Sequence, residues 1–401
     1  MGRSGEGLNQ LEQLCELPEA EKSRRGLVHT PQEIRQQPET WLATFDLFRA
    51  RRNEIQRHLE AAGLSGGDRS PLTVFLVGAG SSDYVGHALA NLLRKSWQSE
   101  VFAVPSTDLL THMDELVLGG RRYLWISFSR SGDSPEGVAL LGRALERYPE
   151  IHHLVVSCNS SGRMVCDHAG EPRVLAIPLA DRVNDRGLAM TSSFTNMVVF
   201  GQCLAHVGNL SLYENLLSRL AKAAASFLPR AADLAAALGA SRFRKACFVG
   251  SGALRAVARE SALKLVELTA GRTLTLSESA LGLRHGPMAA LDEESLFVCF
   301  LAGDRRVEAY ERDLLAEIGR KRLARERVVV GGSERSTDSF AEHYLALETV
   351  SSIADDYRAP VDVILGQLLG LFSSIRWDLL PDCPSPTGAI SRVVENVSIH
   401  V

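Results

Sequence analysis

The chain has 401 residues, of which 45% are hydrophobic and 23% charged, with a formal net charge of −4. This composition is typical of a globular protein with a sizeable core, and the lack of a basic excess argues against nucleic acid or an anionic membrane as partner. Seven cysteines without CxxC spacing disfavour a zinc ribbon and a disulfide framework. No signal peptide or membrane-length apolar stretch is evident, so we expect a cytoplasmic protein without nucleic-acid or membrane partners.

The first predicted elements are helices. The N-terminal 28 residues show no clear pattern and are expected to be weakly ordered. Thr30, Pro31 and Glu33 then have the types and spacing of an N-cap, a first-turn proline and a capping-box acid. Apolar residues at helical spacing continue over about residues 39–64, and Gly66-Gly67-Asp68 is expected to end this helix.

Two runs of three strand-like segments follow, and a loop and a helical pattern come after each segment. The segments are Val74–Gly80, Tyr123–Ser129 and His153–Asn159 in the first half, and Ala246–Gly252, Leu296–Asp304 and Arg327–Ser333 in the second. Nearly equal separations within the two runs indicate a duplicated α/β unit. We therefore expect in each half a three-layer αβα sandwich with a mainly parallel sheet, and ligand sites at the carboxyl ends of the strands.

The loop SFSRSGDS, after the second strand, has the composition of a phosphate site. Ser129, Ser131 and Ser134 supply hydroxyl donors, and Gly132 lets backbone N–H groups approach an anion closely. The alternative is a serine-rich turn that caps the following helix. The corresponding segment of the second half, FLAGDRR, has no serine, and this asymmetry fits one phosphate site per chain.

The sequence GAGSS ends the neighbouring strand and brings Ser82 toward the same edge. A nucleotide-binding turn of the GxGxxG type is the rival interpretation. Asp83 stands where the third glycine of that motif belongs, and this glycine is needed for close packing of helix and strand. The sequence therefore argues against a dinucleotide cofactor.

Two further candidates lie in the second half. RESALKLVEL is helical in pattern and places Glu260, Lys264 and Glu267 on one face, where a solvated ion-pair stripe is the common alternative to a catalytic set. His285 precedes Gly286-Pro287, a tight turn that would fix the position of the imidazole. A lone loop histidine is more often structural or solvated than catalytic, so both interpretations stay open.

Taken in order, the motifs GAGSS, SFSRSGD, CNSSGRM, NDRGLAMTSSFT, ESALKLVELTAG and RHGP resemble the double sugar isomerase (SIS) domain family. Within that family, the tail TGAISRVVENVSIH and the segment 184–195 resemble the AgaS branch of tagatose-6-phosphate ketose/aldose isomerases and galactosamine-6-phosphate deaminases. The resemblance covers roughly residues 28–400. It implies an N-terminal helical segment in residues 1–65, SIS domains in 66–212 and 213–380, and a tail in 381–401.

The resemblance also implies the roles of individual residues. Ser82, Ser129, Arg130, Ser131 and Ser134 would hold the sugar phosphate, Glu267 would be the base, Lys264 its nearby cation and His285 the ring-opening group. The family further implies a homodimer with shared active sites. We expect no metal or cofactor, because the serine loop suits a phosphate without a metal and the dinucleotide motif is incomplete. Chemistry supports the trio independently, because an aldose phosphate needs a proton shuttle at the ring oxygen, a base at C1 and C2, and a cation for the developing oxyanion.

One departure separates the chain from glucosamine-6-phosphate synthases of this superfamily, which carry a lysine in the C-terminal tail. No lysine follows Lys321, and Arg392 cannot form a Schiff base. Together with the lack of a glutaminase domain, this favours a deaminase, with hydrolase and isomerase character, that converts galactosamine-6-phosphate or a close aldose 6-phosphate to tagatose-6-phosphate and ammonia. A plain ketose/aldose isomerase and a non-catalytic sugar-phosphate sensor remain alternatives. The sequence leaves open the sugar epimer and the roles of Glu278, Arg186, Thr191 and Arg392.

Overall fold

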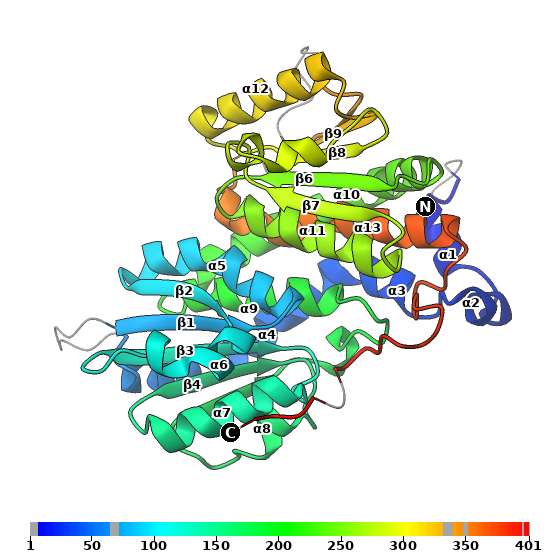
Figure 1. Ribbon diagram of the computed structural model, residues 1–401. Coiled ribbons are helices and arrows are strands. Elements are labelled where there is room, and N and C mark those ends of the chain that lie inside the picture. The colour runs from blue at the N-terminus through cyan, green and yellow to red at the C-terminus, as the bar shows by residue number, and fades with distance from the viewer. Residues whose placement is uncertain (1–6, 65–71, 332–339, 348–351, 395–396, 401) are drawn as a thin grey trace. The chain divides into compact units, whose positions relative to one another are not determined.

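The computed structural model describes residues 7–64, 72–331, 340–347, 352–394 and 397–400. These residues group into two compact units, each with one parallel sheet (Figure 1). The first-sheet unit consists of Glu39–Asp185, Ser192–Ser218 and Ser391–Val401. The second-sheet unit consists of Met1–Pro38, Arg186–Thr191 and Arg219–Ile390.

The first-sheet unit contains five parallel strands in the order β2-β1-β3-β4-β5. They are β1 (Leu72–Gly78), β2 (Glu100–Pro105), β3 (Arg122–Ser129), β4 (His152–Ser157) and β5 (Val174–Pro178). Its helices are α4 (Gln37–Ala61), α5 (Ser81–Trp97), α6 (Ser106–Leu116), α7 (Pro135–Arg147), α8 (Arg163–Cys166) and α9 (Ser192–Ala205). The strand order reverses between β1 and β3, and ligands of such sheets bind beyond the carboxyl ends of the strands at this switch point.

Helices cover both faces of the first sheet, because alternate side chains of each strand point to opposite faces. Phe75 and Val77 of β1 share a buried cluster with Leu109 of α6 and Leu140 of α7. On the other face, Leu76 approaches Gly86 of α5, where an added Cβ would lie 3.0 Å from the Leu76 side chain. The expected αβα sandwich is present in this unit.

The second-sheet unit repeats this topology with the order β10-β9-β8-β6-β7, all parallel. Its strands are β6 (Lys245–Gly250), β7 (Leu274–Glu278), β8 (Leu296–Phe300), β9 (Glu326–Val330) and β10 (His343–Leu345). Its main helices are α11 (Leu254–Leu268), α12 (Arg305–Lys321) and α13 (Ala359–Arg376), and α10 (Leu210–Gly239) leads into the unit from the first. Figure 1 shows α12 on one face of this sheet and α11 and α13 on the other.

The duplication extends to the turn after the first strand of each sheet. Gly80 has a φ of +57° and Gly252 a φ of +59°, a left-handed conformation that glycine adopts without strain. An added Cβ at Gly78 would lie 2.4 Å from the backbone of Ser82, and one at Gly250 would lie 2.3 Å from the backbone of Leu254. The same pair of glycines therefore makes the same tight strand-to-helix turn in both units.

All six strands predicted from the sequence are present within a few residues, although the end of the last one, at residues 332–333, lies outside the described residues. Within the residues that the structure describes, four strands were missed, and each of them lies at a sheet edge: β2, β5, β7 and β10. The edge strands β7 (LTLSE) and β10 (HYL) lack the continuous apolar run by which a buried parallel strand is recognised. The edge strand β5 (VLAIP) is apolar throughout and was missed all the same.

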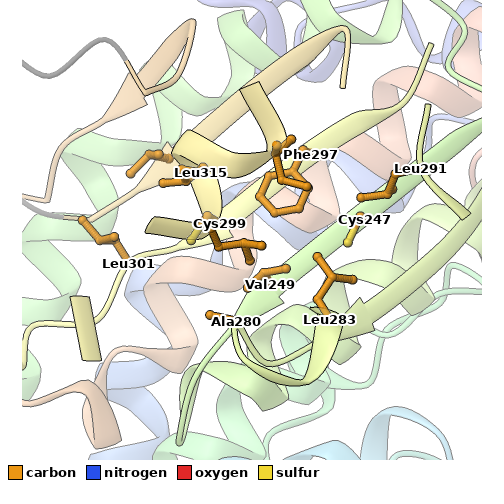
Figure 2. Close-up of a cluster of buried hydrophobic side chains, with 12 residues drawn as sticks. Cys247, Val249, Ala280, Leu283, Leu291, Phe297, Cys299, Leu301 and Leu315 are labelled. Carbon is orange, nitrogen blue, oxygen red and sulfur yellow. The ribbon is translucent and has the colours of Figure 1, made fainter. Parts of the chain in front are cut away.

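A hydrophobic cluster between the second sheet and α12 holds that unit together (Figure 2). Phe297 and Cys299 of β8 and Cys247 of β6 pack in it beside Leu315 of α12. Leu283 joins the same cluster from the segment that precedes His285. Because Leu283 is fully buried, the backbone two residues before His285 is anchored to the core.

The N-terminal segment is more ordered than the sequence indicated. Residues 10–15 form α1 (Gln10–Cys15), which begins with a capping box of Asn9 and Glu12, and residues 19–25 form α2 (Glu19–Arg25). Both helices are shorter than the windows in which helical periodicity can be read, which explains why they were missed. The predicted stop at Gly66-Gly67-Asp68 lies outside the described residues.

The predicted cap of the next helix, α3 (Thr30–Arg35), was wrong in its details. Thr30 is the first helical residue rather than the N-cap, and its N–H and hydroxyl both donate to the carboxylate of Asp382. Glu33 accepts from the backbone N–H of Gly187 instead of reaching back to the cap. The carboxylate of Asp382, distant in the sequence, thus receives the N–H at the start of this helix, which only the tertiary structure reveals.

Helix α13 has 18 residues with a mean hydropathy of 1.2, so by length and composition a membrane-length apolar helix is present, contrary to the expectation from sequence. It is 83% buried within the structure, which is the pattern of a core helix. Its glycines allow very close packing on α11. A Cβ at Gly366 would lie 2.3 Å from Ser261 Oγ, and one at Gly370 would lie 2.6 Å from the Leu268 side chain.

This close approach predicts that Gly366→Ala destabilises the protein by about 1–3 kcal/mol, because the added methyl group meets the Ser261 backbone as well as its hydroxyl. Gly142→Ala is the matched control. It lies inside α7 with nothing within 4 Å of an added Cβ, so it should stabilise by up to about 1 kcal/mol. Urea unfolding of both variants measures the difference, and equal effects would contradict the packing described here.

Candidate active site

The serine-rich loop lies at the switch point of the first sheet, directly after β3. The hydroxyl of Ser129 accepts the N–H of Gly132 at 3.0 Å, and that of Ser131 accepts the N–H of Asp133 at 3.2 Å. Gly132 has a φ of +66°, and a Cβ there would lie 3.0 Å from Ser157 Oγ. Glycine is therefore required here for both conformation and space.

The loop ends at a helix N-terminus. Ser134 is the N-cap residue of α7, and Ser82 lies in the first turn of α5, which follows the neighbouring strand β1. Helix N-termini present unpaired N–H groups and a partial positive charge, which favour an anion. The structure thus brings Ser129, Ser131 and Ser134 together in one loop, with Ser82 after the adjacent strand.

Two residues that the sequence did not single out shape this loop. Asn159, after β4, donates through Nδ2 to the carbonyl of Ser131 at 2.8 Å and to Asp133. Asp133 in turn accepts the N–H of Arg163 at 2.8 Å. Asn159 and Asp133 belong to the motifs CNSSGRM and SFSRSGD, on which the family resemblance rests. The motifs therefore marked these residues, but a motif does not predict which hydrogen bonds its side chains form.

Arg130 differs from its serine neighbours. Its side chain is largely buried, and Nη2 donates to the backbone carbonyl of Arg392 in the C-terminal tail. The adjacent Cys158 is 1% exposed, and burial holds the pKa of its thiol far above the usual value, an effect that Asp185 reinforces. A thiol held protonated in this way is a poor nucleophile.

In the second-sheet unit, the charged face of α11 is buried rather than solvated. Lys264 and Glu260 are both fully buried, and Lys264 Nζ lies 2.5 Å from Glu267 Oε2 and 3.4 Å from Glu260 Oε1. Glu267 keeps 30% of its side chain exposed. The alternative of a solvent-facing ion-pair stripe is therefore wrong: the lysine is an internal cation that contacts one carboxylate with access to solvent.

His285 lies at the end of the 3₁₀ turn η2 (Gly282–Arg284), with its N–H bonded to the carbonyl of Gly282. Gly286 follows with a φ of +122°, and Pro287 starts the next turn, as the sequence predicted. Arg284 ties the loop to Glu317 of α12 at 2.8 Å. The backbone at His285 is thus fixed, while its imidazole is exposed. The structure records no hydrogen bond between this imidazole and any of the described residues.

The residues whose roles the sequence left open have protein partners. Glu278 ends β7 and pairs with Arg255 at 2.6 Å, and the carbonyl of Thr191 accepts from Gln367. The backbone N–H of Arg186 donates to Glu33. Arg392 donates through Nε to the carbonyl of Asp185 at 2.5 Å. The Glu278 and Arg392 contacts engage the side chains, whereas the Arg186 and Thr191 contacts are made by the backbone.

The corresponding edge of the second sheet is filled by the protein's own carboxylates. Glu311 of α12 is fully buried and accepts the N–H of Ala302 at 2.7 Å and the hydroxyl of Ser251. Asp355 accepts the N–H of Gly303 at 3.0 Å and the guanidinium of Arg358 at 2.8 Å. These carboxylates occupy the N–H groups of Ala302 and Gly303 after β8, where the first sheet offers its serine loop, and the Ser251 hydroxyl after β6. The asymmetry noted in the sequence therefore has a structural counterpart.

Glu311 predicts a pH effect on stability. Burial raises its pKa to about 7 from 4.5, so between these values the folded state binds more protons than the unfolded state, and this carboxyl lowers the stability as pH rises. Glu311→Gln keeps an acceptor for Ala302 and removes the charge. Its stability gain over the native chain should grow from about pH 4.5 to 7, to at most about 3 kcal/mol, and be constant above.

Denaturant unfolding of both proteins across pH 4–8 measures this gain. The difference between them cancels the opposite contribution of His153, whose pKa burial lowers to about 3 and which therefore favours the folded state as pH rises. A gain that does not change with pH would contradict the assignment.

The chain is 33% identical to the D-galactosamine-6-phosphate deaminase AgaS of Escherichia coli over 372 residues, which cover 92% of this chain and 95% of the relative. The chain belongs to the AgaS family. It is 38% identical to a Streptomyces coelicolor protein that carries the same name provisionally, over 93% of this chain and 95% of the relative. No general family model matches the chain.

Solved structures agree with the AgaS assignment. The tagatose-6-phosphate ketose/aldose isomerase of Escherichia coli matches with a TM-score of 0.82 and 30% identity, over 93% of this chain and 96% of that one. The C-terminal domain of a glucosamine-fructose-6-phosphate aminotransferase from Francisella tularensis, at 18% identity and a TM-score of 0.73, covers 87% of this chain and 96% of that one and shows the shared fold alone. The predicted double SIS architecture and AgaS resemblance are confirmed.

Proposed function

We propose that the protein is an amino sugar-phosphate deaminase that converts galactosamine-6-phosphate and water to tagatose-6-phosphate and ammonia. The observation that carries the proposal is the buried Lys264 ammonium 2.5 Å from Glu267, a carboxylate that solvent and a small substrate can reach. The AgaS relatives, named for this activity at 30–38% identity, support it.

The steps follow from the chemistry of the substrate. His285 takes the hydroxyl proton at C1 and returns a proton to the ring oxygen, which opens the ring. Glu267 then removes the proton from C2 and gives it to C1, while O1 takes up a proton and the amino nitrogen loses one, so that the enolamine becomes a ketimine at C2 with a hydroxyl at C1. Lys264 stabilises negative charge that develops on O1 during the transfer. Water adds to the ketimine and ammonia leaves, which gives the ketose.

The phosphate is the fixed end of the substrate in this proposal. Ser82, Ser129, Ser131 and Ser134 hold it with hydroxyl and backbone N–H groups, with Arg130 contributing its charge. Binding a part of the substrate that does not react positions C1 and C2 for the base. We further propose that the enzyme works in the cytoplasm as a homodimer, without a cofactor or metal, and that the exposed His285 serves a site shared between subunits.

Ammonia release from galactosamine-6-phosphate by the purified protein tests the proposal. Ammonia well above that of a protein-free control, with tagatose-6-phosphate as the co-product, is the expected result. No ammonia from either galactosamine-6-phosphate or glucosamine-6-phosphate would contradict it.

A plain ketose/aldose isomerase is the second candidate, because the Escherichia coli structural relative is named for that reaction. The same proton transfer between C1 and C2 performs it when a hydroxyl replaces the amino group. Incubation with tagatose-6-phosphate and analysis of the sugar products separates the two: an aldose formed at a rate above that of ammonia release would favour the isomerase. A non-catalytic sensor would bind both galactosamine-6-phosphate and tagatose-6-phosphate but convert neither of them.

A further inference from the structure

The C-terminal tail contributes contacts to the serine loop within the first-sheet unit. Arg392 donates through Nε to the carbonyl of Asp185 at 2.5 Å and through Nη2 to Oδ1 of Asn184. Its own carbonyl accepts from Arg130 of the loop. Further along, the carbonyl of His400 accepts from Arg143 of α7 at 2.6 Å, and Figure 1 shows the tail running beside α7 and α8. We name residues 391–394 the tail strap.

The tail strap joins segments that follow two different strands of the first sheet. Arg130 follows β3, and the Asn184–Asp185 turn follows β5, with β4 between them. Between them, the backbone N–H of Cys158, directly after β4, donates to the carbonyl of Ser129 at 3.2 Å. The tail strap is therefore at the carboxyl edge of the sheet, where the phosphate loop also lies.

The turn that Arg392 holds is itself rigid. Asp185 is 1% exposed, and its carboxylate accepts the backbone N–H groups of Ser192 at 3.1 Å and Ser193 at 2.8 Å, at the start of α9. A capped helix end has a fixed backbone conformation. The Arg392 side chain binds the Asp185 carbonyl of this turn, and the Arg392 carbonyl accepts a hydrogen bond from Arg130.

We propose that Arg392 is a positioning residue that holds Arg130, and with it the phosphate loop, in the conformation that binds substrate. The planar guanidinium of Arg130 has five donors in a fixed arrangement, so a hydrogen bond at one nitrogen sets the direction of the others. Because the contact with the tail already orders the Arg130 side chain, phosphate binding costs less side-chain conformational entropy. Ser131 and Gly132, the next residues of the loop, follow Arg130 directly.

This inference rests on the proposed function, since it assigns the loop to the substrate phosphate. Its experiment compares the native chain with Arg392→Ala and Arg392→Lys in steady-state turnover of galactosamine-6-phosphate and in calorimetric binding of inorganic phosphate. We expect Arg392→Ala to raise KM and the Kd for phosphate by about tenfold or more, the effect of losing a charge-assisted hydrogen bond, with kcat nearly unchanged. Arg392→Lys, which cannot serve both acceptors through a fork, should be intermediate.

Arg143→Ala is the matched control, because it also removes an arginine contact to a tail carbonyl, but on α7 away from the loop. It should leave KM, kcat and phosphate affinity unchanged. If both Arg392 variants bind phosphate as the native chain does, or if Arg143→Ala has the same effect as Arg392→Ala, the inference is wrong. A native chain that binds phosphate but releases no ammonia would contradict the proposed function instead, and the phosphate measurements would still decide the role of Arg392.

Discussion

Glu267→Gln is expected to reduce ammonia release by about 10²–10⁴-fold while leaving the affinity for inorganic phosphate unchanged. The amide is nearly the same size as the carboxylate and can still accept a hydrogen bond from Lys264, which lies 2.5 Å away in the native chain. It cannot carry the proton between C2 and C1. Because phosphate is proposed to bind to serines of the other unit, the loss should fall on kcat and not on binding.

Glu308→Gln is the control for this variant. Glu308 also pairs with a cation on a helix, Arg312 at 2.7 Å, but it has no place in the proposed chemistry. Its turnover should match that of the native chain. Turnover of Glu267→Gln within about tenfold of native would remove Glu267 from the base role, because a positioned base normally contributes more than that.

The sequence predicted the central parts of the fold because burial leaves a strong imprint on them. The central strands of both sheets are nearly continuous apolar runs, and all of them were found. The four edge strands were not. The strand β7, which has a neighbour on one side only and Leu274 66% exposed, carries a mixed pattern, although β5 is apolar throughout. The capping of α3 by Asp382, which is 352 residues away from Thr30, has no local signal at all.

The candidate site divides in the same way. Loop residues with a local signature, such as Ser129, Gly132 and Ser134, lie where the motif and the strand pattern placed them. The burial of Lys264 could not be predicted, because its helical spacing to Glu260 and Glu267 is equally compatible with a solvated stripe. Lys264 is buried because α13 packs closely against α11, and the glycines of α13 make this close packing possible. The contact of Arg130 with Arg392 is likewise a long-range pairing without periodicity.

Lys264→Met is expected to lower the free energy of unfolding by about 3–5 kcal/mol and to abolish turnover. The substitution keeps most of the side-chain volume in a flexible apolar chain but removes the positive charge that lies 3.4 Å from the fully buried Glu260. A carboxylate left in the interior without its cation must lose hydration or take up a proton, and both cost free energy. Urea unfolding near neutral pH measures the loss.

Two comparisons make this expectation specific to the buried pair. Lys245→Met removes a lysine from an ion pair with Asp292 at 2.7 Å in which both side chains are more than 40% exposed, so it should cost at most about 1 kcal/mol. The double variant Lys264→Met with Glu260→Gln should recover part of the stability, since it removes the stranded charge, but no activity. If Lys264→Met unfolded at the same urea concentration as Lys245→Met, Lys264 would have to be solvated in the folded protein. The proposed mechanism would then have no buried cation beside Glu267.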